Sequence, residues 1–317
     1  MLFHKNYVIL PCMKPQDKSH KEIQKILSRR GEDQIKSSIT HEECEKIILA
    51  AANDMGVIRN GGRRGAAFGP SCITNAFKKF ASHSKDNKKI QIFEVAGDES
   101  DFNQMQLQEI ENIKKSLDIL KRTHLCHLGG GHDHIYPLAM AIAESFKRKI
   151  HIINIDAHLD TRVDDFSHSG TPFRQLKINL KDQLRITQIG IQEISNVESN
   201  WNSIDMTVHL LSTLEKDFEH FNNLDLDLID KILDIKNEEL TIFSLDLDAI
   251  KGYEFSAVSA VNPLGLPLSF IHTLLSRYLS KVELKVVGLY EYNPMFDDLA
   301  AKDAKVCAEL IKQSLQL

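Results

Sequence analysis

Three short polar segments contain the residue types that bind divalent metal ions. They are GGGHD at residues 129–133, DAHLD at residues 156–160 and SLDLD at residues 244–248, and each follows an apolar run. Histidine and carboxylate side chains together suit Mn²⁺, Fe²⁺ or Zn²⁺. Two such ions side by side can bridge one water molecule and lower its pKa, which produces a hydroxide nucleophile at neutral pH. The segments therefore predict a hydrolase with a binuclear metal centre.

The spacing within these segments supports a shared metal site. Asp156, His158 and Asp160 are two residues apart, as are Asp246 and Asp248. In an extended chain, side chains at this spacing point to the same side. Carboxylates crowded behind buried strands repel one another, and a cation removes that cost. The oxygen-rich set favours Mn²⁺, and the lack of clustered cysteines in the sequence argues against a structural zinc site.

The elements expected around these segments alternate between strands and helices. Mostly continuous apolar runs, typical of strands buried on both faces of a parallel sheet, are found at residues 90–95, 123–128, 150–155, 184–191, 207–211, 240–247 and 284–290. Helical patterns are found at residues 105–121, 136–147, 224–235 and 268–279. This alternation predicts a three-layer α/β/α sandwich with a mainly parallel sheet. Ligands of such sheets bind beyond the carboxyl ends of the strands, where the three metal-type segments are expected.

The N-terminal part has a different composition. Residues 14–45 are rich in Lys, Glu, Gln and Ser, and they lead into a helix expected at residues 41–52, with Thr40 as its N-cap. No internal repeat or convincing linker follows. We therefore expect a single catalytic domain over residues 1–317, in which residues 1–50 form an extension packed on the rest.

The overall composition excludes several classes of partner. The chain has 317 residues, 42% of them hydrophobic, and a net charge of −5, so no nucleic-acid or membrane surface is indicated. No stretch approaches the roughly 18 apolar residues of a membrane span. The five cysteines are scattered and form no CxxC pair. A cytoplasmic protein with reduced thiols is the simplest interpretation.

In their order and spacing, the three segments resemble the ureohydrolase family of arginases, agmatinases and formimidoylglutamases, over about residues 56–298. The resemblance implies an arginase-like fold and two Mn²⁺ per subunit, with other divalent metals as alternatives. One ion would be bound by His132, Asp156, Asp160 and Asp246. The other would be bound by Asp156, His158, Asp246 and Asp248. Asp156 and Asp246 would bridge the two ions.

Several further segments resemble the formimidoylglutamase branch. Gly131 stands where arginases and agmatinases usually carry Asp, and Phe173 stands where arginases have a histidine proposed as proton shuttle. Other segments that match this branch are residues 160–162, 169–174, 190–192 and 258–263, together with the loop at 59–65 and the pair at 69–70. The sequence departs from the family at residues 298–302 and at Val261, which replaces a common proline.

The resemblance implies hydrolysis of N-formimidoyl-L-glutamate to L-glutamate and formamide, a step of histidine degradation, by a metal-bridging hydroxide. Asp160 and Glu291 would be catalytic: Asp160 would position the hydroxide, and Glu291 would pair with the amidine group. Arginine side chains suit bidentate binding of the substrate carboxylates. The residues expected to bind substrate are Arg162, Ser169, Arg174 and Glu291, with Arg63 and Arg64 as further candidates and His168 as a spare acid or base.

Two alternatives remain open. A hydrolase of another guanidino or amidino compound, of the agmatinase, guanidinobutyrase or arginase type, would have the same metal ligands. A non-catalytic metal-binding scaffold would have no need for Glu291. The only expected partner is a small amidine or guanidine substrate, and the resemblance adds a homo-oligomer without fixing its symmetry.

Overall fold

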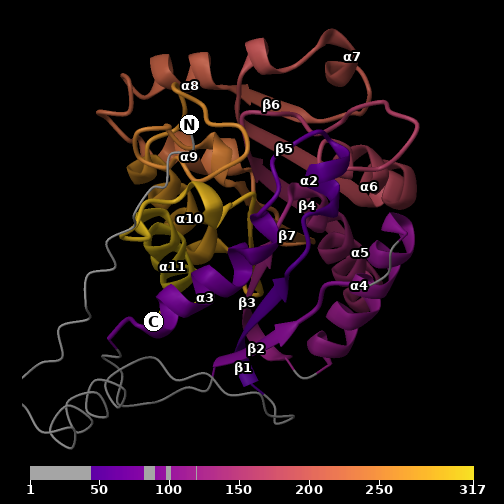
Figure 1. Ribbon diagram of the computed structural model, residues 1–317. Coiled ribbons are helices and arrows are strands. Elements are labelled where there is room, and N and C mark those ends of the chain that lie inside the picture. Colours follow the sequence, from indigo (N-terminus) through magenta and orange to yellow (C-terminus); the bar gives the residue numbers. More distant parts are fainter. Residues whose placement is uncertain (1–43, 82–89, 98–100, 119) are drawn as a thin grey trace, which may run out of the picture.

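The computed structural model describes residues 44–81, 90–97, 101–118 and 120–317, and its centre is one eight-stranded sheet (Figure 1). All neighbouring strands of this sheet are parallel. From one edge to the other, the strands are β2 (Ile90–Glu94), β1 (Cys44–Ala51), β3 (Leu120–Gly129), β8 (Lys285–Tyr290), β7 (Glu239–Asp246), β4 (Lys149–Ile155), β5 (Leu184–Ile191) and β6 (Thr207–Leu210).

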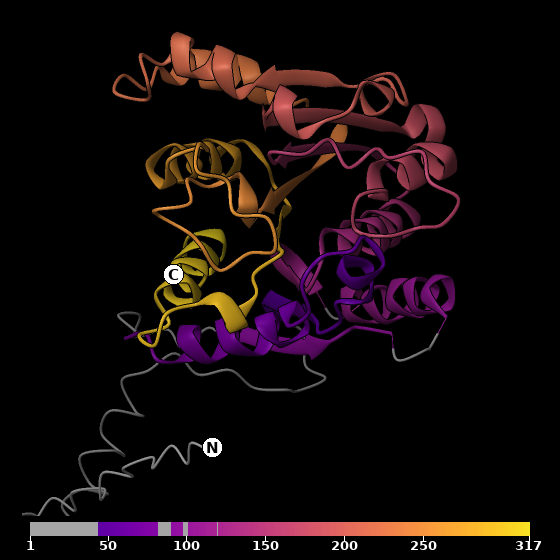
Figure 2. The ribbon, with the colours of Figure 1, turned by 45° about the horizontal axis from the view of Figure 1, so that its top comes forward.

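Helices cover both faces of the sheet (Figures 1 and 2). One face carries α4 (Phe102–Leu117), α5 (Ile135–Phe146) and α6 (Pro172–Leu180). The other face carries α3 (Gly69–Lys78), α8 (Leu211–Asp217), α9 (Leu226–Leu233), α10 (Leu268–Lys281) and α11 (Lys302–Ser314). The short helices are α2 (Met55–Arg59), α7 (Glu198–Trp201) and the 3₁₀ turns η1 (Ala66–Phe68), η2 (His132–His134), η3 (Lys181–Gln183), η4 (Glu193–Ser195), η5 (Leu247–Ala249) and η6 (Pro294–Phe296). The predicted three-layer sandwich is confirmed.

The core consists of two apolar clusters, one on each side of the sheet. Neighbouring residues of a strand contribute to different clusters: in β7, Ile242 belongs to the α5 side and Phe243 to the α10 side. Burial on both faces explains why the strands read as continuous apolar runs. In the ranges that the structure describes, no helix combines the length and apolar character needed to cross a bilayer.

The helix predicted at residues 41–52 is wrong, because Cys44–Ala51 form strand β1 between β2 and β3. Ile47, Ile48 and Leu49 are completely buried, which requires cover on both faces and favours a strand inside a sheet. A short apolar run fits either element, so periodicity alone does not separate them. The predicted N-cap Thr40 and the rest of residues 1–43 lie outside the described residues.

Candidate metal centre

The predicted metal-ligand segments meet because their strands are neighbours. Strands β3, β8, β7 and β4 are adjacent in the sheet, although β8 is the last of the eight along the chain. Since all four run in the same direction, the residues that follow them emerge at one edge. This edge gathers residues 129–133, 156–160 and 246–248, together with Glu291.

Four candidate ligands form a first group around His132, at the start of η2. The Nδ1 atom of His132 lies 3.1 Å from Asp156 Oδ2, 2.9 Å from Asp160 Oδ2 and 3.2 Å from Asp246 Oδ2. These four residues are close enough together to hold one metal ion. They are the four that the family resemblance assigns to one manganese.

A second group contains Asp156, His158 and Asp248. The Nδ1 atom of His158 lies 3.1 Å from Asp248 Oδ2 and 3.5 Å from Asp156 Oδ1. The two oxygens of Asp156 thus face different groups, as a bridging ligand requires. Asp246 belongs to the first group alone, and its Oδ1 accepts the backbone N–H of Asp248 at 2.9 Å. A bridging role for Asp246 stays a prediction.

The donor atoms at this edge fit a divalent cation. His132 Nε2 contacts Ser244 Oγ at 3.0 Å, which directs the Nδ1 lone pair towards the carboxylates. That Nδ1 atom is close to three carboxylate oxygens but forms no hydrogen bond with them, and Asp248 Oδ1 is likewise buried without a hydrogen bond. Buried polar atoms are normally satisfied, so these two imply a missing ligand. Ser244 belongs to one of the three polar segments, but the sequence alone gave it no role. In the structure it contacts the candidate ligand His132.

Two carboxyl groups of the candidate centre have unusual pKa values. Burial, followed by repulsion from Asp246, raises the pKa of Asp248 to about 8. Burial, followed by repulsion from Asp156, raises the pKa of Asp160 to about 6. A bound metal needs these groups deprotonated, so binding must release protons.

We therefore expect Mn²⁺ binding to weaken as the pH falls from 8 to 6, because Asp248, whose pKa burial raises to about 8, takes up a proton over this range. The affinity should fall about tenfold per pH unit for each proton displaced. The measurement is the rise in melting temperature on adding Mn²⁺ at each pH. An equal rise at both values would contradict the expectation.

Glu291 directly follows β8 and faces the same edge. Its Oε1 accepts the backbone N–H of His132 at 3.0 Å. Both Glu291 (φ 70°) and Asp160 (φ 51°) have left-handed backbone, a conformation that costs about 1–3 kcal/mol and concentrates at functional sites. Asn293 keeps the segment in place, because its backbone N–H donates to Ala257 O and its side chain donates to Arg64 O.

A cavity of ≈ 300 Å³ opens in front of the centre. Its lining includes four of the candidate metal ligands, His158, Asp160, Asp246 and Asp248. Glu291 and the predicted substrate residues Arg162 and Ser169 also line it, and so does Arg63. The cavity thus has an acidic, metal-binding side and two arginines in its wall.

Arg162 is oriented by a neighbour that the sequence reasoning did not single out. Arg162 Nη1 donates to Asn60 Oδ1 at 2.8 Å, and Asn60 Nδ2 donates to Ser169 Oγ at 3.1 Å. Asn60 lies in the loop at residues 59–65, which matches the formimidoylglutamase branch. Its place in that loop was the only indication in the sequence of a role for Asn60. Arg63 differs from Arg162, because its guanidinium is bound to the Val258 and Ser259 carbonyls and stacks over Phe296.

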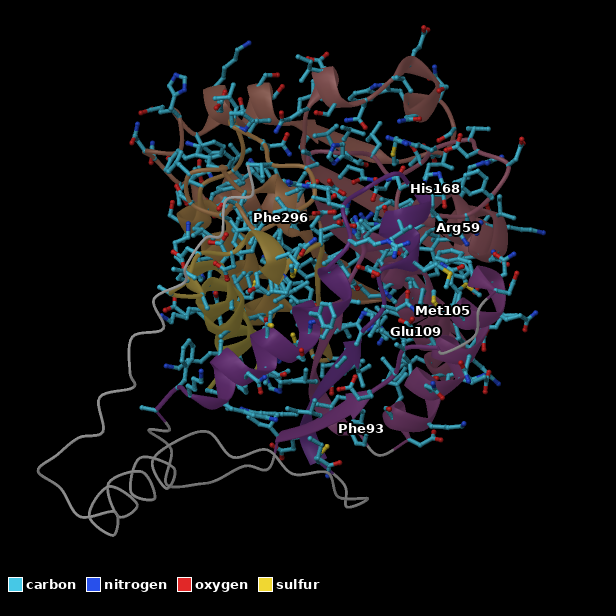
Figure 3. The ribbon with its side chains drawn as sticks, viewed as in Figure 1. Arg59, Phe93, Met105, Glu109, His168 and Phe296 are labelled. Carbon is cyan, nitrogen blue, oxygen red and sulfur yellow. The ribbon has the colours of Figure 1, made fainter. Side chains whose placement is uncertain are left out.

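Three other predicted residues lie elsewhere. Arg174 and Arg64 are not among the residues that line the cavity, and Arg174 Nη1 donates to Asp164 O at 3.4 Å. His168, labelled in Figure 3, is buried and also absent from the lining. Its Nδ1 accepts the Gly170 N–H and its Nε2 lies 2.7 Å from Asp164 Oδ2, so it stabilises the loop and is no spare acid or base in the cavity.

The two positions that distinguish the predicted branch have clear packing reasons. A Cβ atom at Gly131 would lie 2.4 Å from Asp133 Oδ1 and 2.7 Å from Val57 Cγ2, so a side chain there would require both of these side chains to move. Phe173 is completely buried, and its ring packs edge-on against His132 with centroids 5.5 Å apart. It supports a candidate ligand from behind.

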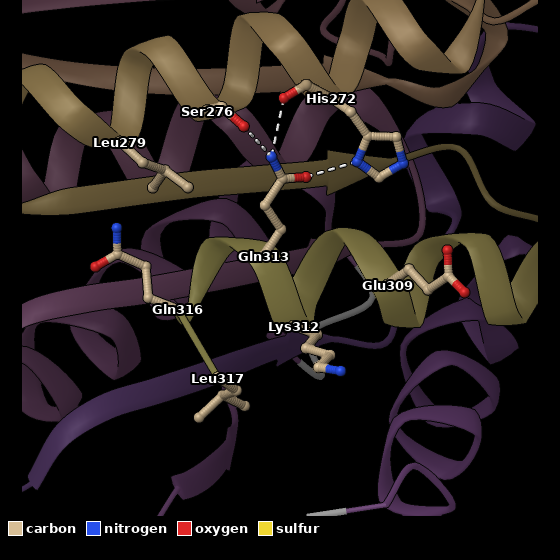
Figure 4. A pocket seen from close by; sticks show the side chains of 8 residues that line it. All are labelled: His272, Ser276, Leu279, Glu309, Lys312, Gln313, Gln316 and Leu317. Atoms are coloured by element: carbon tan, nitrogen blue, oxygen red, sulfur yellow. Dashed lines mark hydrogen bonds between the residues drawn. The ribbon is translucent and has the colours of Figure 1, made fainter. Parts of the chain in front are cut away.

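A larger cavity, of ≈ 520 Å³, lies between α10 and α11 (Figure 4). Gln313 joins its walls by hydrogen bonds to His272 and Ser276. Neither group of candidate metal ligands in the described residues includes a residue of this cavity. Of these two cavities, the candidate metal ligands therefore line only the smaller one.

Comparison with known proteins agrees with this centre. The model of the arginase family matches residues 46–316. Formimidoylglutamase from Klebsiella pneumoniae is 31% identical over 271 residues, 84% of this chain and 83% of that protein. Citrobacter koseri formimidoylglutamase is 31% identical over 273 residues, which are 84% of this chain and 83% of that protein.

Solved structures show the same fold. Trypanosoma cruzi formiminoglutamase with Mn²⁺ superposes with a TM-score of 0.73 at 22% identity, covering 89% of this chain and 96% of that one. Formimidoylglutamase from Bacillus subtilis superposes with a TM-score of 0.75 at 17% identity, covering 90% and 91%. The family predicted from the metal-type segments is confirmed, and the chain belongs to the arginase family.

Proposed function

We propose that this chain hydrolyses N-formimidoyl-L-glutamate to L-glutamate and formamide, using two Mn²⁺ ions. The observation that carries the proposal is the cavity in which Glu291 and Arg162 face two ligand groups that share Asp156. The names of the bacterial relatives support the substrate, and the Trypanosoma cruzi structure with Mn²⁺ supports the metal. Histidine degradation as the pathway and the cytoplasm as the location are parts of the same proposal.

The proposed metal ligands are those of the two groups. His132, Asp156, Asp160 and Asp246 would hold one ion, and Asp156, His158 and Asp248 the other, with Asp246 as a second bridge. When bound, the pair would supply a hydroxide nucleophile at neutral pH and neutralise charge that develops on the substrate. Without a cation, the buried atoms His132 Nδ1 and Asp248 Oδ1 would remain without a hydrogen bond or a ligand.

The remaining steps belong to side chains of the cavity. Glu291 accepts an N–H of the formimidoyl group and so orients its carbon. Asp160 holds a proton taken from the attacking water and returns it to the nitrogen of glutamate, at a carboxyl oxygen in the cavity wall. The C–O bond forms first, and the C–N bond to that nitrogen then breaks. The second proton of the water goes to the nitrogen that stays in formamide, so one water is consumed for each formamide released.

Arg162 is the proposed partner of a substrate carboxylate. It lines the cavity, and Asn60 occupies one of its nitrogens, which leaves the other face of the guanidinium available. The geometry does not support the same role for Arg174, which lies outside the lining. An arginine in the cavity wall would also disfavour a cationic substrate such as agmatine.

Replacing Arg162 with alanine is expected to raise KM about tenfold or more, because a charge-assisted hydrogen bond contributes about 1.5–3 kcal/mol. The Mn²⁺ content should stay unchanged, since Arg162 belongs to neither ligand group. Steady-state kinetics with formimidoylglutamate give the result. Arg174→Ala is the matched comparison, and an equal rise in KM there would restore the clamp predicted from the sequence.

The proposed function is tested by a substrate panel. The purified chain, loaded with Mn²⁺, is assayed with formimidoylglutamate, arginine, agmatine and guanidinobutyrate, and both formamide and urea are measured. We expect the highest kcat/KM with formimidoylglutamate. Preferred release of urea would assign the chain to another branch of the family, and no turnover with bound metal would indicate a scaffold.

A further inference from the structure

A cluster of buried polar side chains lies behind His132, away from the substrate cavity. It consists of Glu109 on α4, His127 on β3, His134 in η2 and Tyr290 at the end of β8, all of them completely buried. None of them lines the cavity or belongs to a ligand group. Burying a carboxylate and two imidazoles is costly unless they pair.

Glu109 is the charged centre of this cluster. It lies one helical turn after Met105 on α4 (Figure 3). Its Oε2 is 2.7 Å from His134 Nδ1, and His134 Nε2 is 2.9 Å from the carbonyl oxygen of Asn53. Both nitrogens of His134 thus have hydrogen-bond partners, one on α4 and one on the segment after β1. His134 therefore joins α4 to the turn that carries His132.

The second oxygen of Glu109 faces His127. Glu109 Oε1 lies 3.5 Å from His127 Nε2, which is an ion-pair distance without a hydrogen bond. On the other side of the ring, His127 Nδ1 lies 3.1 Å from the hydroxyl oxygen of Tyr290. The negative charge of Glu109 favours a ring hydrogen on the nitrogen that faces it, which leaves Nδ1 to accept the Tyr290 hydroxyl group.

Tyr290 connects this cluster to the metal centre. Its ring stacks on the imidazole of His132, with centroids 5.1 Å apart and planes 27° from parallel. Phe173 also contacts the ring of His132, edge-on, with centroids 5.5 Å apart. The ring of His132 therefore packs against two aromatic side chains, and one of these, Tyr290, is anchored through its hydroxyl group to the buried cluster.

We propose that Glu109, His127 and Tyr290 are positioning residues that fix the ring of His132 and so set the metal affinity of the first ligand group. This assignment rests on the proposed metal centre. The contact is selective, because His132 belongs to the first group and not to the second. If the ring of His132 is displaced, the protein should bind one of the two metal ions more weakly and the other as before. A general loss of stability should affect the binding of both ions alike.

The test is an Mn²⁺ titration of the metal-free full chain, with free Mn²⁺ followed by electron paramagnetic resonance. Tyr290→Leu, which removes both ring and hydroxyl, should weaken one of the two binding steps about tenfold, as is usual when support of a ligand is lost. Tyr290→Phe keeps the stacked ring and should have a smaller effect of the same kind. Glu109→Gln, which does not touch His132, should also weaken that step.

Tyr278→Phe is the matched control. Tyr278 is a completely buried tyrosine of α10 whose hydroxyl oxygen lies 2.9 Å from the carbonyl oxygens of Thr241 and Val286. This substitution should lower the melting temperature and leave both binding steps unchanged. The proposal is overturned if Tyr290→Leu and Tyr290→Phe keep native affinities, or if Tyr278→Phe weakens one step as strongly. A native chain that binds no Mn²⁺ would overturn the proposed metal centre as well.

Discussion

Replacing Asp156 with asparagine is expected to prevent binding of both manganese ions and to lower kcat/KM by about 10³-fold or more. Asp156 is the ligand whose two oxygens face different groups: Oδ2 lies 3.1 Å from His132 Nδ1 and Oδ1 lies 3.5 Å from His158 Nδ1. An asparagine keeps the shape of the side chain but loses the charge and one acceptor. No other residue in the described part of the chain belongs to both groups.

The metal effect can be measured without any substrate. Saturating Mn²⁺ should raise the melting temperature of the native chain, because a ligand at 100 times its Kd stabilises by about 2.7 kcal/mol. The Asp156→Asn chain should show no such rise, and elemental analysis should find it free of manganese. Two equivalents of manganese retained in this variant would disprove the shared ligand.

A matched control uses the same substitution at a surface ion pair. Asp230 on α9 pairs with Lys281 at 2.8 Å and with Arg277, and its side chain is 21% exposed. Asp230→Asn should change stability by at most about 1 kcal/mol, as is usual for such pairs. Activity and metal content should remain native.

Replacing Glu291 with glutamine should give a different pattern, in which the metals remain and turnover is lost. We expect kcat/KM to fall about 10²- to 10³-fold, as when one oriented catalytic contact is removed. Glu291 lines the cavity and belongs to neither ligand group. Its Oε1 accepts the His132 N–H, and the carbonyl oxygen of glutamine can do the same, so the local fold should persist.

The kcat/KM and the manganese content of Glu291→Gln should be measured on the same preparation. Glu144→Gln on the surface, where Glu144 pairs with Lys114 at 3.0 Å, is the control and should be fully active. Loss of manganese from Glu291→Gln would show that Glu291 acts on the metal centre instead of the substrate. Native kcat would remove Glu291 from the mechanism.

The residue types of the centre were predictable from the sequence because strand ends carry strong local signals. Each candidate ligand follows an apolar run, and the expected strand at residues 184–191 coincides with β5. The expected strand at 150–155 differs from β4 by one residue at one end, and that at 240–247 differs from β7 by one residue at each end. Burial on both faces produces such runs, so the positions of the polar residues after them could be predicted.

Side-chain direction outside the strands was not predictable in this way. Arg162 and Arg174 are only 12 residues apart, and both were expected to bind substrate. In the structure, Arg162 lines the cavity and Arg174 does not. Arg162 donates to Asn60, which is 102 residues away along the chain, whereas Arg174 donates to the nearby Asp164 carbonyl oxygen. Similarly, Tyr290 read as an ordinary strand residue, and its stacking on His132 follows from the pairing of β3 with β8.

The sequence by itself determined which atoms are available for chemistry and the alternation of strands and helices, because residue type and apolar periodicity are local properties. The tertiary structure alone decided that β8 and β7 lie between β3 and β4, and so brought three distant segments to one edge. It also decided that residues 44–51 form a strand. The physical reason is that a short apolar run can be buried as a helix or a strand, and only the neighbours that cover its faces determine which.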